Sequence, residues 1–162
     1  RAAIVIGAES SSFQIVASLT KRLPVMITPA WVRTPSQPIY VDDVVEYLAG
    51  AIETPAARGR TFEIGGPEVL SYEEMMQRTA AVLGRRLYVI PVPVLTPRLS
   101  AYWVDLVTDV PASVAHPLIE GMKNPVVVTD DSVTDVIDVD LTPFDDAVRQ
   151  TLEDMEAPPV DA

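Results

Sequence analysis

The chain has 162 residues, 48% of them apolar, and a formal net charge of −11. That length fits one domain with a sizeable core, and the acidic balance argues against a nucleic-acid partner or an anionic membrane surface. With no cysteine, disulfides and thiolate metal sites are excluded, and a reducing cytoplasmic location is the default expectation. The apolar runs are too short to insert into a membrane.

The first elements indicate a buried strand followed by a helix. Residues 2–6 form a continuous apolar run that ends at Gly7, which is typical of a strand covered on both faces. The serines at 10–12 are helix N-cap residues, and Pro24 ends the helix that they begin. Residues 25–27 then predict a short strand. Because the chain begins without Met, directly in a buried-type strand, we expect it to be a fragment of a longer protein.

Residues 39–53 predict a strand that turns directly into a helix. Ile39, Tyr40 and Val41 favour a strand, and Asp42 or Asp43 is expected to cap the helix. Asp43 and Glu46 would form an acidic capping box. One apolar face is expected to be buried; it consists of Val44, Val45, Leu48, Ala49 and Ile52.

A third unit follows at residues 61–91. Residues 61–64 predict a strand, ended by Gly65 and Gly66. The sequence 71–74, Ser-Tyr-Glu-Glu, is a capping box, and Gly84 is the expected C-terminal cap of the helix. Residues 87–91 predict another strand. This alternation predicts an α/β fold, a partial Rossmann-type layer of mostly parallel short strands with helices.

The character of the chain changes after residue 91. Two helices are expected after Thr96 and Val110, an edge strand at residues 126–128, and a last helix after Thr142. The acidic stretch 130–140 lacks the spacing of a calcium loop and is interpreted as solvated. His116 and the Tyr102-Trp103 pair are interpreted as packing residues. We therefore expect a single domain over 1–156, with alternation over 1–91, a mainly helical C-terminal lobe over 92–156, and a flexible tail at 157–162.

Three motifs carry a resemblance to a known family. The segment 38–44, Pro-Ile-Tyr-Val-Asp-Asp-Val, resembles a late strand–helix unit of extended and atypical short-chain dehydrogenase/reductase (SDR) proteins. Residues 1–7 are similar to the strand that follows their catalytic helix, and residues 62–74 to a later strand and helix. The resemblance is nearest to the atypical NAD(P)-binding, epimerase/dehydratase-like branch, which includes the SDR-like accessory subunit of respiratory complex I. It covers nearly the whole chain as the second half of such a protein.

Two signatures of the family's chemistry are absent from this chain. It has no G-x-G-x-x-G or G-x-x-G-x-x-G fingerprint, because Gly65-Gly66 follows the wrong strand and lacks a third glycine. It also has no Tyr-x-x-x-Lys pair. The residues four positions after the five tyrosines are Val44, Ala51, Met76, Val92 and Leu106. The chain alone should therefore not be a dehydrogenase.

The resemblance also implies site residues. It places Ala2, Ala3 and Ile4 beside the nicotinamide. Ser10, Ser11, Ser12, Phe13, Arg33 and Gln37 would line the substrate side. Sheet core, helix caps and loop hydrogen bonding are the alternatives for these residues. Ile4 and Ser36 stand where sugar-nucleotide epimerases of the family have Asn and Arg, which argues against that substrate. No metal site is expected, since Asp42 and Asp43 are interpreted as caps.

Two functional hypotheses remain open from the sequence. In the first, the chain is the substrate-side C-terminal portion of an NAD(P)-dependent oxidoreductase or epimerase-like protein, inactive alone. In the second, the parent is a non-catalytic SDR-like scaffold or regulator, or the piece is a self-associating module. NAD or NADP would bind the full-length parent, with none bound by this chain alone. The expected partner is the missing N-terminal half or a second copy of the chain, because a central parallel strand would otherwise expose its edge.

Overall fold

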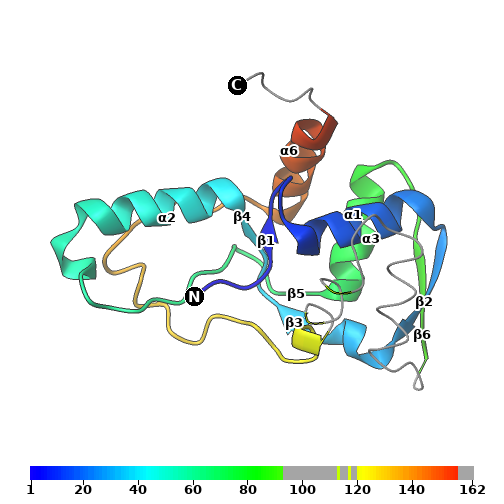
Figure 1. Ribbon diagram of the computed structural model, residues 1–162, viewed down its shortest axis with the longest axis horizontal. Coiled ribbons are helices and arrows are strands. Elements are labelled where there is room, and N and C mark those ends of the chain that lie inside the picture. The colour runs from blue at the N-terminus through cyan, green and yellow to red at the C-terminus, as the bar shows by residue number, and fades with distance from the viewer. Residues whose placement is uncertain (93–112, 114–116, 118–119, 157–162) are drawn as a thin grey trace.

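The computed structural model describes residues 1–92, 113, 117 and 120–156 (Figure 1). The predicted tail, the Tyr102-Trp103 pair, His116 and most of the two helices expected after Thr96 and Val110 lie outside the described residues. Within the part that is described, no helix is both long and apolar enough to cross a bilayer.

Strands and helices alternate through the first half of the chain, as the sequence predicts. The elements are β1 (Val5–Ile6), α1 (Ser11–Arg22), β2 (Val25–Pro29), the 3-10 turn η1 (Ala30–Arg33), β3 (Pro35–Ser36), β4 (Ile39–Tyr40), α2 (Val41–Glu53), the 3-10 turn η2 (Pro55–Ala57), β5 (Leu70–Ser71), α3 (Tyr72–Val82), β6 (Tyr88–Val92) and α6 (Phe144–Glu156). Strand β1 pairs with β4 and β2 with β6, both in parallel, while β3 and β5 are antiparallel. The α/β prediction with mostly parallel strands is confirmed, although the strands form three separate pairs rather than one layer.

Three expected strands are shorter than predicted, because their partners change along the chain. Residues 2–6 contribute only β1 and a single bridge between Ala2 and Ile64. The Ile64 N–H donates to the Arg1 carbonyl at 2.8 Å, but the Gly66 N–H donates to Pro38 instead, at 3.1 Å. Segment 61–66 therefore bonds first to the N-terminal segment and then to Pro38, and forms no continuous strand ladder with either. Segment 126–128 likewise makes one bridge, from Val126 to Ser36.

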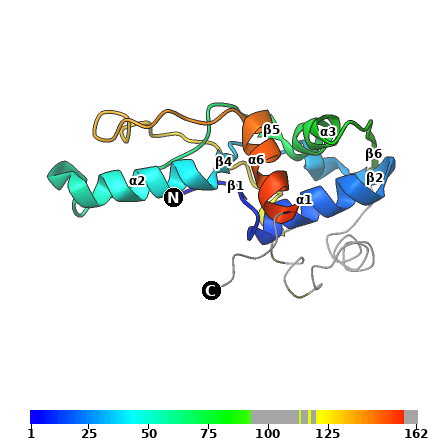
Figure 2. The ribbon, with the colours of Figure 1, turned by 90° about the horizontal axis from the view of Figure 1, so that it is seen from above.

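Two hydrophobic cores hold these elements together. The larger packs α1, α3 and α6 around side chains such as Phe13, Met75 and Val148, each at most 1% exposed. The smaller lies between α2 and the loop before α6, and includes Tyr47 and Ile137. Figure 2 shows α2 extending to one side of the molecule, away from α1 and α3. Among the described residues, the second core is enclosed by α2, η2, the β1–β4 pair and loops.

Two of the three predicted N-terminal side-chain caps form in the structure. The Ser10 hydroxyl accepts from the Phe13 N–H at 3.4 Å, and Ser71 and Glu74 form the reciprocal capping box at the start of α3. Gly84 has a φ of 69° and follows the last turn of α3, where a left-handed residue ends a helix. Local sequence decides these termini, and they form as predicted.

The predicted cap of α2 is wrong. The residue before the helix is Tyr40, which makes no side-chain capping bond. Asp43 is 3% exposed and faces α6 instead. It accepts from the Thr142 N–H at 2.9 Å and from the Thr142 hydroxyl at 2.7 Å. Because Asp43 lies within the first turn of α2, its carboxylate points across to Thr142 rather than back to the helix N-terminus.

The predicted apolar face of α2 is mostly exposed. Val44 packs against the smaller core, but Val45, Leu48 and Ile52 are 56%, 60% and 81% exposed. The buried residues of α2 are Asp43 and Tyr47, which lie on a different side of the helix from Val45, Leu48 and Ile52. Gly50 shares this inner side, where a Cβ would lie 2.6 Å from the Ile137 side chain. The close approach of Ile137 therefore turns the more polar side of α2 inward.

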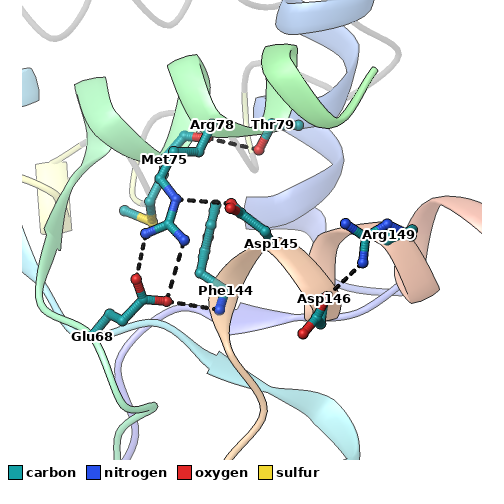
Figure 3. Close-up of polar contacts among 8 residues, drawn as sticks. All are labelled: Glu68, Met75, Arg78, Thr79, Phe144, Asp145, Asp146 and Arg149. Atoms are coloured by element: carbon teal, nitrogen blue, oxygen red, sulfur yellow. Dashed lines mark hydrogen bonds and ion pairs between the residues drawn. The ribbon is translucent and has the colours of Figure 1, made fainter. Parts of the chain in front are cut away.

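Arg78 joins α3 to the start of α6 (Figure 3). Its guanidinium donates to Glu68 at 2.5 Å and to Asp145 at 2.8 Å, and lies 5.1 Å from the centre of the Phe144 ring. Glu68 also accepts from the Phe144 N–H at 2.9 Å. The hydrogen bond from Arg78 is the largest cause that lowers the pKa of Glu68. This group fixes the N-terminus of α6 on the side of α3.

Candidate functional site

A cavity of about 230 Å³ lies beside the N-terminal segment that the sequence assigns to the cofactor. Three segments that are distant in sequence form its walls. The lining residues are Arg1, Ala2, Ala3, Glu63, Ile64, Pro125, Val126, Val127, Val128 and Thr129. The two alanines contribute only methyl groups, so backbone and apolar surface make up most of the wall. A surface of this kind fits the flat, uncharged part of a ligand.

Gln37 holds the cavity-lining segment 126–128 in place through hydrogen bonds. Its side-chain amide donates to the Gly66 carbonyl at 2.8 Å and accepts from the Val128 N–H at 3.0 Å. Its backbone N–H donates to the Val126 carbonyl at 2.9 Å. A Cβ at Gly65 would lie 2.7 Å from the Gln37 side chain, so glycine is required for this approach. Gln37 thereby joins segment 65–66 to segment 126–128.

Glu63 is the acidic residue of the lining, and segment 129–130 satisfies its carboxylate. It accepts from the Thr129 N–H and hydroxyl, both at 2.9 Å, and from the Asp130 N–H at 3.3 Å. These bonds, with the Thr129 N–H as the largest cause, lower the pKa of Glu63. The carboxylate is therefore ionised at neutral pH and serves to hold the loop.

The structure brings some of the predicted site residues together and separates others. Ala2 and Ala3 line the cavity, and Gln37 supports it. Ile4 does not line it; its carbonyl accepts from the Ile39 N–H at 3.0 Å, at the junction of β1 and β4. Ala2 is exposed rather than enclosed in a sheet core, which was the alternative for this position.

The remaining predicted residues lie elsewhere. Ser10 caps α1, and Ser11 and Ser12 occupy its first turn. Phe13 is 0% exposed within the larger core. The Arg33 guanidinium is 2.9 Å from a Glu73 carboxylate oxygen, and this ion pair joins η1 to α3. None of these five residues lines the cavity.

Sequence reasoning missed Glu63 and segment 125–129. Glu63 meets Thr129 across 66 positions of the chain, a contact that no local pattern indicates. Residues 126–128 carried only the signal of an apolar strand. Their contribution to a cavity depends on the turns that bring them back to residues 1–3.

The lining of the described cavity contains no tyrosine, lysine or histidine. Burial is the largest cause that raises the pKa of Tyr40, to about 12, and of Tyr47 and Tyr72. Those phenols stay protonated at neutral pH, whereas an acid–base catalyst needs a pKa near the working pH. No cluster of three or more His, Cys, Asp or Glu among the described residues could hold a metal ion.

A larger cavity, of about 470 Å³, lies between the loop before α6 and α6 itself. Asp140, Asp146, Arg149 and Glu153 are among its lining residues, and Nη1 of Arg149 lies 2.5 Å from Oδ1 of Asp146. It contains none of the predicted cofactor or substrate residues. We therefore place the candidate site at the alanine-lined cavity.

Such parallel strand pairs with intervening helices define a partial Rossmann-type fold, and known structures share it. The chain resembles triphenylmethane reductase from Citrobacter sp. complexed with NADP(H), with a TM-score of 0.66 and 16% identity over 90% of this chain and 51% of that one. It also resembles a nucleoside-diphosphate-sugar epimerase from Staphylococcus aureus, with a TM-score of 0.65 and 12% identity over 90% and 50% of the two chains. A third match is a variant UDP-glucuronic acid 4-epimerase from Bacillus cereus in complex with NAD and a UDP-sugar, with a TM-score of 0.59 and 12% identity over 95% and 43%.

These likenesses confirm, at the level of fold, the resemblance to the extended SDR group. At such identities they establish the fold and not the activity. The chain spans about half the length of each of these proteins. No family model matches the sequence, and no curated protein matches it.

Proposed function

We propose that this chain is the substrate-side, C-terminal portion of an NAD(P)-dependent oxidoreductase or epimerase-like protein, and that it is inactive alone. The observation that carries the proposal is the extent of the structural likeness. The structural likeness covers 90% of the chain for a reductase complexed with NADP(H) and 95% for an epimerase complexed with NAD, yet the chain covers only about half of each. The remaining half would supply the phosphate-binding glycines and the cofactor.

The cavity supports a role in completing a binding site. Ala2 and Ala3 offer a small, uncharged part of the wall beside Ile64, and the Glu63 carboxylate is held by hydrogen bonds from Thr129 and Asp130. A nicotinamide ring or an apolar substrate could lie against such a wall without leaving a buried polar group unpaired. The bond-making groups would then come from the other half.

The substrate is proposed not to be a nucleotide sugar. By the family resemblance, Ser36 stands about where the epimerases have an arginine, and it is 0% exposed within β3. The same resemblance places Ile4 where they have an asparagine. The loss of both polar contacts also favours, as the second candidate, a parent protein that binds a nucleotide and acts as a scaffold or regulator without catalysis.

The test begins with the reading frame upstream of Arg1. The encoded full-length polypeptide and this chain are each titrated with NADH and NADPH and followed by cofactor fluorescence. We expect binding by the full-length polypeptide and none, or only weak binding, by the chain. Tight binding to the chain alone, or no binding by a full-length polypeptide, overturns the proposal. A Tyr-x-x-x-Lys pair upstream would favour catalysis, and glycines without that pair would favour the scaffold.

A further inference from the structure

Helix α2 presents three distinct surfaces around its axis. The inner surface, with Asp43 and Tyr47, packs on the smaller core. The second is an exposed apolar stripe, which consists of Val45, Leu48, Ala49 and Ile52. The third is an exposed acidic edge of Asp42, Glu46 and Glu53. At about 100° per residue the stripe lies between the inner surface and the acidic edge.

The apolar stripe is unlike the scattered apolar residues that any protein surface carries. Val45, Leu48 and Ile52 follow at spacings of three and four on one helix, and each is more than half exposed. A soluble surface helix normally turns such a set toward a core, so a continuous exposed stripe marks a contact surface. Here the inner side of α2 is already filled, by Ile137 against Gly50.

We propose that the apolar stripe of α2 is the docking surface for the nucleotide-binding half of the same polypeptide. This inference rests on the proposed function. The chain covers only 43–51% of the proteins whose fold it shares, so about half of such a fold lies outside it. Helix α2 begins at the residue that follows β4, and β4 pairs in parallel with β1. Parallel strands with their crossover helices are covered on both faces, so the absent half is the expected neighbour of this helix.

The charges disfavour a second copy of the chain as the occupant. Each copy carries a net charge of −11, and the acidic edge runs alongside the stripe. An interface between two copies would bring like charges together. The docked half is therefore expected to present apolar side chains opposite Leu48.

Thiol labelling tests the docking surface, because this chain has no native cysteine. Leu48→Cys places a thiol on the stripe, and Glu46→Cys is the matched control on the acidic edge of the same helix. Both are made in this chain and in the full-length polypeptide freed of other cysteines, and the rate of reaction with a disulfide reagent is measured. In the chain alone both thiols should react rapidly. In the full-length polypeptide the reaction rate of the thiol at position 48 should fall at least about tenfold. The reaction rate of the thiol at position 46 should not change.

The outcomes separate this inference from the proposed function. Equal rates at position 48 in both proteins, with NAD(P)H bound by the full-length one, overturn the docking surface alone. Protection at position 48 without cofactor binding overturns the proposed function and leaves the contact. Concentration-dependent protection in the isolated chain identifies a second copy as the occupant and overturns the proposal. As a second readout, Leu48→Glu should leave the urea midpoint of the chain unchanged but lower that of the full-length polypeptide; equal effects on both count against docking.

Discussion

The bond between Asp43 and Thr142 joins residues 99 positions apart and offers the sharpest test of the fold. Asp43→Ala removes a carboxylate that is 3% exposed and that accepts two hydrogen bonds from Thr142. It leaves the Thr142 N–H without its partner at the start of α6. The change should therefore destabilise the attachment of α6, whereas loss of a simple helix cap would act on α2 alone.

The expected loss follows from the two bonds. Each hydrogen bond to a charged group contributes about 1.5–3 kcal/mol, and Thr142 is only half-buried, so water recovers part of this. We expect Asp43→Ala to lower the free energy of unfolding by about 2–3 kcal/mol. Asp43→Asn can still accept from the Thr142 N–H and can donate to the Thr142 hydroxyl, so it loses mainly the charge and should cost about 1 kcal/mol or less.

Urea unfolding followed by far-ultraviolet circular dichroism measures these losses. With a slope of about 2 kcal/mol per molar urea, Asp43→Ala should lower the midpoint by about 1–1.5 M. Glu46→Gln, an exposed charge loss on the same helix, should change the free energy by less than about 0.5 kcal/mol. A double-mutant cycle with Thr142→Ala should give a coupling above about 0.5 kcal/mol. Additive losses at the two positions would refute the contact.

Three further predictions follow from single contacts. Gly66→Ala places a Cβ 2.1 Å from the Pro38 carbonyl oxygen and should destabilise by about 3 kcal/mol or more, whereas Gly121→Ala, with open space around it, should be near neutral in the same urea assay. Arg78→Lys replaces the planar guanidinium that bonds Glu68 and Asp145 with a single ammonium, and should lower the melting temperature by about 2–6 °C; an unchanged value would contradict this link between α3 and α6. Burial raises the pKa of Tyr40 to about 12, so the stability it contributes is present below pH 10 and lost as pH rises toward 12. An ultraviolet titration of tyrosinate, compared with Tyr40→Phe, should lose its latest step in the variant.

The elements that sequence predicts well are those that neighbouring residues decide. Ser71 and Glu74 lie three positions apart and satisfy each other's backbone groups, so α3 begins where the pattern says. Pro24 and Ser10 bound α1 in the same way. The parallel pairing of β1 with β4 follows from their alternation with helices.

The orientation of α2 could not be predicted, because a distant segment decides it. Periodicity identifies an apolar face but not whether this chain covers it. Ile137 reaches Gly50 across the chain, and Thr142 takes the carboxylate that a cap would have used. These contacts turn the helix so that its apolar stripe faces outward. The candidate site shows the same limit, since Glu63 and Thr129 meet only in three dimensions.

The distribution of satisfied polar groups also indicates what kind of defect mutations in this half should cause. Gln37 and Glu63 have polar side chains at or beside the candidate cavity, and hydrogen bonds within the chain engage both. A group held in this way supports the shape of a wall and has no proton free for chemistry. Changes at these residues should therefore weaken ligand affinity through a displaced segment 125–129, and should leave the pH dependence of any reaction unaltered. The groups that set such a pH dependence would lie in the half that α2 is proposed to contact.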